Sequence, residues 1–327
     1  MLIREFTSGL ELDQVLLVRE VEPRANRDGA DVLKLTLADR SGQVPAMVWD
    51  GVAEAAALAR PGAPVRVIGR FSVHPHHGPQ ISLRALRAPR PESFALEDLL
   101  DGPVRSVEQM EGSVRDLVAT IQSPHLRLLL ERLLGEPSEV WAAFRVAPAA
   151  KRYHQAYPHG LLEHCLTVAQ AVSAISATFP GIDRDVAVTG ALLHDIGKLE
   201  AYETHGPAIA MSDDGRLQGE IPLGYYRVRR TIEELDGFPP DLGQALLHII
   251  LSHHGSLEHG SPVVPCTREA TLVHMIDNLG GRLGSFDRIE KQLSGDQRWS
   301  GFDRALGGGA FFGSRPAEGR EDRREAA

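Results

Sequence analysis

The stretch from Ala191 to Lys198, Ala-Leu-Leu-His-Asp-Ile-Gly-Lys, places two adjacent metal-type ligands directly after an apolar run. Buried polar side chains must be paired or bound to a metal, because leaving them unsatisfied in an apolar setting is costly. An imidazole nitrogen beside a carboxylate oxygen suits Mn, Fe, Mg or Zn. We predict that His194 and Asp195 bind a metal and that Lys198 contacts a phosphate beside it. Gly197 is expected to end the preceding helix in a left-handed conformation.

Further His and Asp residues occur elsewhere in the second half of the chain and could complete such a site. With the adjacent pair they make the set His164, His194, Asp195, His253, His254 and Asp277. Inward-pointing side chains on facing helices of a bundle commonly build metal sites. Each residue alone has an ordinary interpretation, as a core or surface His or as an Asp277 paired with Arg282. In this order and number, they predict a metal centre.

Helices after residue 149 are expected to position these ligands. Apolar residues at helical spacing and helix-capping residues indicate where the helices lie. The predicted ranges are 161–176, 183–194, 223–236, 240–253 and a last helix after Thr267. Asp183 and Thr267 are the expected N-caps, and 211–219 is expected to be a turn-rich loop.

The first part of the chain is expected to form a β-barrel. Alternating apolar residues between turn signals predict short strands. The expected strands are 15–18, 32–37, 44–49, 65–71 and 80–83, with a helical stretch over 52–59 between the third and the fourth. This order is typical of an OB-fold.

OB-folds bind single-stranded nucleic acid through basic and stacking side chains, so the barrel has candidate contacts. These are Trp49, Arg66, Arg70, Phe71 and His74. The alternative for Trp49 and Phe71 is that they fill the barrel.

The predicted fold class is therefore multidomain, with an all-β OB-fold barrel followed by an all-α helical bundle. The boundaries are 8–92 for the barrel, 93–147 for a helical connector, 148–303 for the metal-binding bundle and 304–327 for a disordered tail. The tail is assigned from its Gly, Arg and Glu content and its few large apolar residues.

Composition excludes several classes of protein. A formal net charge of −9 argues against a basic nucleic-acid coat, so a nucleic-acid role needs local positive charge or metal ions. Two cysteines without paired spacing, Cys165 and Cys266, argue against a disulfide scaffold or a zinc ribbon. Neither a signal peptide nor a run of membrane-spanning length is visible, so we expect a cytoplasmic protein without a membrane partner. Homo-oligomerisation stays open.

The pattern His-x29-His-Asp-x81-Asp, read at His164, His194, Asp195 and Asp277, resembles the HD-domain metal phosphohydrolases. A closer resemblance is to the YhaM-type 3′–5′ exoribonucleases, which join an N-terminal OB-fold to a C-terminal HD domain. The segments that carry it are 149–151, His154, 160–164, 193–198, 252–255, 260–262 and 274–279.

The resemblance implies a 3′–5′ exoribonuclease that uses a divalent metal to hydrolyse single-stranded RNA, with single-stranded DNA as a second candidate substrate. Mn²⁺ is the first candidate ion and Mg²⁺, Co²⁺ or Fe²⁺ are alternatives, with one or two ions per chain. The first ion would bind to His164, His194, Asp195 and Asp277. A second would bind to His253 and His254, with Glu220 and a bridging Asp195. Lys198 would stabilise phosphate charge, and His154 would contact the phosphate or protonate the leaving oxygen, or else cap a helix.

Two positions depart from the family pattern. His159-Gly160 stands where the family usually has Gly-Gly, and Gly219-Glu220-Ile221 stands where it usually has Gly-His-Ile. Glu220 is a harder, anionic donor than His, which alters the expected second metal site. Its alternative is a surface ion pair with Arg216. Two other functions remain open: an HD phosphohydrolase of small nucleotides or cyclic dinucleotides, and a non-catalytic nucleic-acid-binding protein.

Overall fold

The computed structural model describes residues 1–25, 31–74, 78–100, 102–103, 105–151, 155–205, 208–293 and 297–313. The chain forms two compact units. Unit 1 comprises 1–101, 204–209 and 286–327, and unit 2 comprises 102–203 and 210–285. Within the described ranges, each helix is too short or too polar to cross a lipid bilayer.

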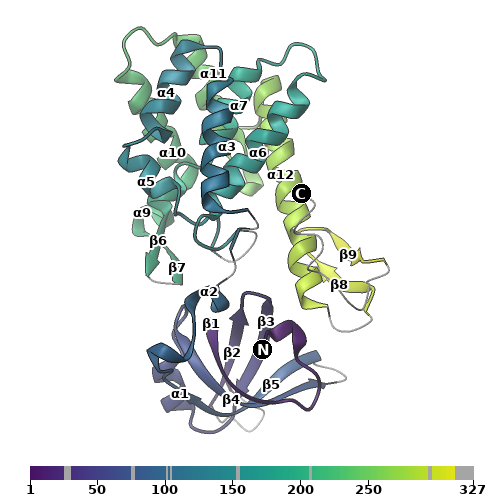
Figure 1. Cartoon of the computed structure of the whole chain (residues 1–327). Helices are drawn as coiled ribbons and strands as arrows, with labels where there is room; N and C mark the ends of the chain where they lie inside the picture. The colour runs from purple at the N-terminus through teal and green to yellow at the C-terminus, as the bar shows by residue number, and fades with distance from the viewer. Residues whose placement is uncertain are drawn as a thin grey trace. The chain divides into compact units, whose positions relative to one another are not determined.

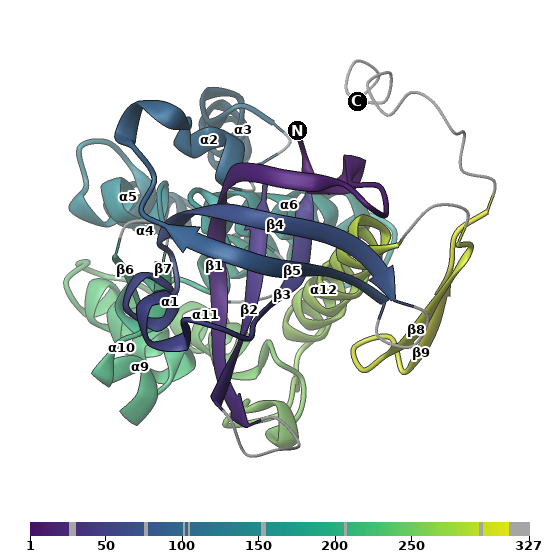
Figure 2. The same ribbon diagram turned by 90° about the horizontal axis from the view of Figure 1, so that it is seen from below.

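A closed five-stranded barrel with the strand order β1-β2-β3-β5-β4 makes up the first part of unit 1 (Figures 1 and 2). Its elements are β1 (Glu11–Ala25), β2 (Asp31–Asp39), β3 (Gly42–Val48), α1 (Val52–Leu58), β4 (Pro64–His74) and β5 (Gly78–Arg87). Neighbouring strands are antiparallel except β3 and β5, which pair in parallel with Ala46 opposite Ile81. The predicted order of five strands, with a helix between the third and the fourth, is confirmed.

Strand β1 shows why the strands are longer than their apolar cores. It pairs with β4 through Glu11–Leu17 and with β2 through Leu17–Ala25, and a bulge between Val18 and Glu20 lets it bend around the barrel. Only Leu12 and Leu16–Val18 of this strand are buried. The polar residues on either side of that buried run still form ladder hydrogen bonds, so apolar alternation predicts only the middle of the strand.

Unit 2 is predominantly helical (Figure 1). Its helices are α3 (Val107–Ala119), α4 (Pro124–Leu134), α5 (Glu139–Phe144), α6 (Gly160–Ser176), α7 (Arg184–Leu193), α8 (Lys198–Ala201), α9 (Asp213–Leu217), α10 (Glu220–Glu233), α11 (Pro240–Ser252) and α12 (Arg268–Gln292), whose last turns belong to unit 1. The expected caps Asp183 and Thr267 accept hydrogen bonds from the amides of Val186 and Ala270. The loop predicted over 211–219 contains α9, and α10 begins three residues earlier than predicted.

The segment 93–147 differs from the connector that the sequence suggested. After the short helix α2 (Leu96–Leu99), helices α3, α4 and α5 contribute Met110, Leu126 and Phe144 to the same hydrophobic core as α6 and α7. These three side chains are fully buried. The expected boundary at 147 therefore runs through one core, because buried side chains of α3, α4 and α5 belong to the same core as those of α6 and α7.

Two small hairpins modify the expected all-α description of the second part. They are β6 (Tyr202–His205) with β7 (Ala208–Met211), and β8 (Trp299–Asp303) with β9 (Gly308–Phe311). The disordered tail predicted from residue 304 is thus wrong for 308–311, because these residues pair with β8. The remainder of that tail, 314–327, lies outside the described residues. The remaining elements are single 3₁₀ turns at Ile3–Glu5, Pro91–Ser93 and Leu257–His259.

Candidate metal centre

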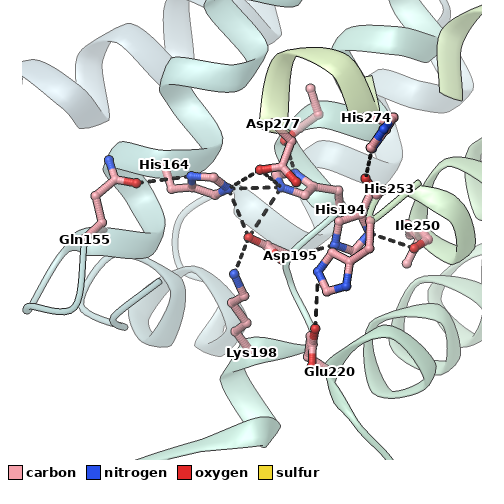
Figure 3. Close-up of polar contacts among 12 residues, drawn as sticks. Gln155, His164, His194, Asp195, Lys198, Glu220, Ile250, His253, His274 and Asp277 are labelled. Carbon is pink, nitrogen blue, oxygen red and sulfur yellow. Dashed lines mark hydrogen bonds and ion pairs between the residues drawn. The ribbon is translucent and has the colours of Figure 1, made fainter. Parts of the chain in front are cut away.

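The ends of α7 and α11, together with positions within α6 and α12, bring the predicted ligands together (Figure 3). His164 lies within α6, and His194 and Asp195 follow the last residue of α7. His253 directly follows α11, and Asp277 lies within α12. The helices α6, α7 and α11 are held in place by apolar side chains that are almost fully buried. Residues far apart in sequence thus meet where α7 and α11 end beside α6 and α12.

His164 Nε2 is the point at which the ligand atoms converge. It lies 3.1 Å from Asp195 Oδ2, 3.1 Å from Asp277 Oδ1 and 3.2 Å from His194 Nε2. Donor atoms that share one octahedral ion at ~2.1 Å stand about 3 Å apart, so these separations suit a common ion. Among the described residues, two groups of possible ligands result, His164–His194–Asp277 and His194–Asp195–His253, each with donor atoms within 4.8 Å of one another. His194 belongs to both.

Every histidine of the cluster has its Nδ1 atom turned to an oxygen acceptor. His194 Nδ1 lies 2.8 Å from Ala191 O, and His253 Nδ1 lies 2.8 Å from Ile250 O. His164 Nδ1 lies 3.1 Å from Gln155 Oε1. Because these oxygens only accept, each Nδ1 carries the proton and donates, and each Nε2 of a neutral ring presents a lone pair to the cluster. This arrangement fixes metal-binding imidazoles.

The charges of the cluster favour a cation among the imidazoles. Burial by itself lowers the pKa of His164, but hydrogen bonds and attraction from Asp195 and Asp277 outweigh it and raise this pKa to about 9. Burial works in the opposite direction on Asp277, yet His164 and His194 hold the pKa of that carboxyl below its usual value. The two carboxylates therefore stabilise positive charge here, and a divalent ion supplies it without a proton.

Two buried polar atoms test whether these residues fit a metal. Asp195 Oδ1 and His253 Nε2 are buried, and neither has a hydrogen-bond partner among the residues that the structure describes. They lie 3.5 Å apart, with the carboxylate oxygen facing the ring nitrogen. A buried acceptor beside a second lone pair is unfavourable unless a cation lies between them. Both atoms belong to one of the two groups above, so the donor set fits a metal ion.

Lys198 lies against Asp195 instead of projecting freely toward solvent. Its Nζ is 2.6 Å from Asp195 Oδ2, and only 14% of its side chain is exposed. Burial alone would lower the pKa of Lys198, but Asp195 raises it above the usual value, so the ammonium stays charged. Lys198 thus balances part of the negative charge of Asp195 directly beside the cluster.

Glu220 and His254 form a pair next to the two ligand groups and, among the described residues, belong to neither. His254 Nε2 lies 3.5 Å from Glu220 Oε1, and His254 Nδ1 donates to His259 O over 2.9 Å. Burial and the neighbouring His253 lower the pKa of His254. The pair has the residue types of metal ligands but lies at the edge of the cluster.

The expected left-handed conformation of Gly197 is wrong. Its φ is −70°, in the right-handed helical region. Glycine is needed there because a Cβ atom would lie 2.0 Å from Glu220 O and 2.4 Å from Gly224 N. The close approach brings the first turn of α10 against the turn after Asp195. The same contact sets the place of Glu220.

Two residues that hydrogen-bond the candidate ligands were not predicted from the sequence to orient them. Gln155 supplies the acceptor for His164, and its backbone has a φ of 59°. His274 donates from Nδ1 to His253 O over 2.8 Å. Only the position of His274, three residues before Asp277 on one helix, could have indicated it. Gly255 packs against this ring, because a Cβ there would lie 2.0 Å from His274 Cε1.

His159, one of the two departures from the family pattern, lies directly before α6. This residue has a φ of 68°, a left-handed conformation that glycine adopts most easily. Here its Nδ1 donates to Arg145 O over 2.5 Å. The other sequence candidate in this segment, His154, lies outside the described residues.

The barrel candidates divide into exposed and buried side chains. Trp49 is 54% exposed and Arg70 is exposed, while His74 is half-buried. Arg66 Nε pairs with Asp13 Oδ1 over 2.6 Å, and this arginine lowers the pKa of the Asp13 carboxyl. The prediction of Phe71 as a nucleic-acid contact is wrong, and its alternative, a side chain that fills the barrel, is confirmed. It is only 6% exposed and packs edge-on against Phe6, because its position in β4 points into the barrel.

Several known proteins are similar to this chain. The model of the HD domain family matches residues 161–281. The 3′–5′ exoribonuclease YhaM of Bacillus subtilis is 31% identical over 87% of this chain and 89% of its own length. The YhaM of Bacillus velezensis is 32% identical over the same shares. A replication protein A OB-fold domain from Methanococcus maripaludis aligns with 27% of this chain and 92% of that domain, at 19% identity and a TM-score of 0.23.

The two YhaM sequences match nearly their whole length to this chain, so the match includes the barrel as well as the helical unit. The HD-domain match includes the pair His194–Asp195 and the ligands His164 and Asp277. The chain therefore belongs to the family of the 3′–5′ exoribonuclease YhaM.

Proposed function

We propose that this protein is a metal-dependent 3′–5′ exoribonuclease that hydrolyses single-stranded RNA. The relatives that match it from barrel to HD domain bear the name 3′–5′ exoribonuclease. The observation that carries the proposal is the set of buried imidazoles whose Nε2 atoms face Asp195 and Asp277 while their Nδ1 atoms donate elsewhere. A cluster of this kind supports phosphodiester hydrolysis, in which negative charge develops at the phosphate.

In this proposal His164, His194, Asp195 and Asp277 hold one divalent ion, with Mn²⁺ as the first candidate. His253 extends the donor set through its 3.5 Å approach to Asp195, and His254 with Glu220 is the candidate partner for a second ion. When bound, a divalent ion lowers the pKa of water and polarises phosphoryl oxygens. Mixed nitrogen and carboxylate donors favour Mn²⁺, Fe²⁺ or Co²⁺ over a purely oxygen-preferring ion.

The side chains around the ion have separate tasks in the proposed reaction. Lys198 keeps its charge within 2.6 Å of Asp195 and adds positive potential where a phosphate would approach. Gln155 and the carbonyl groups of Ala191 and Ile250 hold the imidazole rings in the orientation that presents Nε2. His154 is proposed to contact the phosphate or to protonate the leaving oxygen, a role that rests on the resemblance alone.

The barrel is proposed to bind upstream nucleotides of the RNA. Trp49 offers an exposed indole for base stacking, and Arg70 offers an exposed cation for the phosphates. Arg66 and His74 are further proposed contacts, with Arg66 already charge-paired to Asp13. Single-stranded DNA is a second candidate ligand, because stacking and phosphate contacts do not require a 2′-hydroxyl.

The test uses single-stranded RNA labelled at the 5′ end, incubated with Mn²⁺, Mg²⁺ or a chelator. A ladder that shortens from the 3′ end with either ion and stops with chelator supports the proposal. Labelled single-stranded DNA, a nucleoside triphosphate and a cyclic dinucleotide are run in parallel. Turnover of only the small nucleotides would overturn the exoribonuclease assignment in favour of a small-molecule phosphohydrolase, and no turnover by metal-loaded protein would favour a binding protein.

A further inference from the structure

The hairpin β8–β9 exposes aromatic side chains that the proposed site does not use. Trp299, Phe302 and Phe311 are 62%, 78% and 46% exposed. They lie within a stretch of 17 residues, 297–313, in a chain whose aromatic content is 6%. Exposing three large rings to water is unfavourable unless they serve a contact, so their arrangement calls for a ligand.

A β-bulge brings the three rings to one face of the hairpin. Trp299 pairs with Phe311 and Phe302 pairs with Gly309, which leaves one extra residue on β8 between the two pairs. Cross-strand partners share a face, and positions 309 and 311 of β9 share a face because side chains alternate. Trp299, Phe302 and Phe311 therefore project from the same side. The rings of Trp299 and Phe311 are in contact, with centroids 4.9 Å apart.

The opposite face of the hairpin is the one that anchors it. Ala310 is 1% exposed, and the ring of Phe312 contacts Phe286 of α12 with centroids 6.1 Å apart. Arg288 of α12 pairs with Asp303 Oδ2 over 2.5 Å. The hairpin thus has its own attachment to α12 (Figure 1), and the aromatic face is not needed to hold it there.

Charge on the hairpin favours a polyanion as the ligand. The guanidinium of Arg298 lies over the ring of Phe311, 4.8 Å from its centroid. The sole acidic residue in 297–313 is Asp303, which faces the anchoring side and is paired with Arg288. Proteins that bind single-stranded nucleic acid stack the bases on aromatic rings and contact the phosphates with basic side chains such as arginine. The aromatic face of the hairpin has both kinds of side chain.

We propose that the aromatic face of β8–β9, formed by Trp299, Phe302, Phe311 and Arg298, is a second binding surface for single-stranded RNA, separate from the barrel contacts. Bases stack on the rings, and Arg298 contacts the adjoining phosphate. Stacking does not distinguish the bases, so this surface increases affinity without a sequence preference. The inference rests on the proposed exoribonuclease function, since that function defines the ligand as single-stranded RNA.

Binding is tested with the full-length protein in chelator, so that the RNA stays intact. The probe is a fluorescein-labelled oligoribonucleotide of about 20 nucleotides, longer than one OB-fold site. Trp299→Ala and Phe302→Ala should each raise Kd by about 5- to 100-fold, the loss of one stacked base. Trp299→Phe should recover most of the affinity, and Phe179→Ala, which removes an aromatic side chain that is 56% exposed elsewhere, should leave Kd unchanged.

Tryptophan fluorescence reports the contact directly. RNA should quench the emission of the wild-type protein more than that of Trp299→Phe, because a base stacks on the indole. Equal quenching and an unchanged Kd for both alanine variants would overturn the proposal. A fall in molar mass on light scattering for these variants, with the Kd for RNA unchanged, would also overturn it and would assign the aromatic face to a second copy of the chain.

Hydrolysis of a short oligonucleotide separates this inference from the proposed function. The variants should cleave a substrate of two or three nucleotides at the wild-type rate, because a substrate bound at the metal centre has no further nucleotides to place on a second surface. If the variants bind long RNA like the wild type while short RNA is cleaved, the aromatic surface is refuted and the exoribonuclease assignment stands. If the metal-loaded wild type neither binds nor cleaves RNA, both fail.

Discussion

Asp195 Oδ1 and His253 Nε2 face each other at 3.5 Å in the buried cluster, and in the described part of the chain neither has a hydrogen-bond partner. A divalent ion bound by the cluster would satisfy both atoms. We therefore expect metal to stabilise the fold, by about 2.7 kcal/mol when the ion is present at 100 times its Kd. Denaturant unfolding with Mn²⁺ or with chelator measures this difference. Equal unfolding free energies with bound metal would show that the ion lies outside this cluster.

Substitution of Asp195 is expected to change both the activity and the free energy of unfolding. Asp195→Asn should lower the rate of hydrolysis by more than about 100-fold. Losing a residue that only hydrogen-bonds a metal ligand typically costs about 10- to 100-fold, and Asp195 is itself a proposed ligand. The substitution also leaves the charge of Lys198 buried without its 2.6 Å partner, which should cost about 3–5 kcal/mol of unfolding free energy. The double variant Asp195→Asn/Lys198→Met should regain stability but not activity. Recovery of activity in the double variant would exclude Asp195 as a metal ligand.

Gln155 is expected to act on the metal through His164. Gln155→Met removes the acceptor for His164 Nδ1–H, which is 3.1 Å from Gln155 Oε1. Loss of an orienting partner of this kind should weaken metal affinity or activity by about 10- to 100-fold. Gln155→Glu keeps an acceptor and should retain most of the affinity. Metal titration of both variants is the measurement, and equal affinities for Met and Glu at this position would show that the hydrogen bond does not matter.

Two glycine-to-alanine changes should have opposite effects on stability. In Gly197→Ala the new Cβ would lie 2.0 Å from Glu220 O, a backbone atom, so either the turn after Asp195 or the start of α10 must shift. We expect lower stability and lower activity. Gly280→Ala in α12 meets no atom within 4 Å and should raise stability by up to ~1 kcal/mol. Thermal unfolding of both proteins, with activity measured alongside, tests the contrast, and similar effects would argue against the close approach.

A pH-dependent contact is expected at His248, which is outside the metal cluster. Cys266 N donates to His248 Nε2 over 2.8 Å, so the ring must be neutral there. Burial lowers the pKa of His248 below 6.5, its usual value. The unfolded chain therefore takes up this proton more readily than the folded chain. The contact contributes stability that is complete above about pH 6.5 and is lost as the pH falls through the lowered folded-state pKa.

Hydrogen exchange of the Cys266 amide, corrected for intrinsic rates, measures the effect of His248. Protection should fall as the pH is lowered from neutral toward acidic values. In His248→Gln the side-chain oxygen can still accept this hydrogen bond but does not titrate, so the extra pH dependence should disappear. The same pH dependence in both proteins would assign it to another group.

The chemistry of the site is largely readable in the sequence. An apolar run ends in His194-Asp195, and His164 and Asp277 lie on other predicted helices. This pattern indicates which donor atoms the site has and that these donors are buried. Alternating apolar residues likewise predict the strands of the barrel and their order along the chain. Such patterns are local, because the periods of helix and strand depend on neighbouring residues alone. They are therefore visible without a tertiary structure.

What the sequence left open depends on contacts between distant segments. The sequence leaves both Trp49 and Phe71 as either nucleic-acid contacts or barrel-filling side chains. In the fold, Trp49 follows the end of β3 and is exposed, whereas Phe71 of β4 is buried inside the barrel. The sequence shows a glycine at position 197, but not why a glycine is needed there. The reason is that a Cβ atom on residue 197 would lie 2.0 Å from the backbone oxygen of Glu220. The face on which Trp299 lies follows from its register with Phe311. In each case the decisive neighbour comes from another part of the chain, and only tertiary packing brings it there.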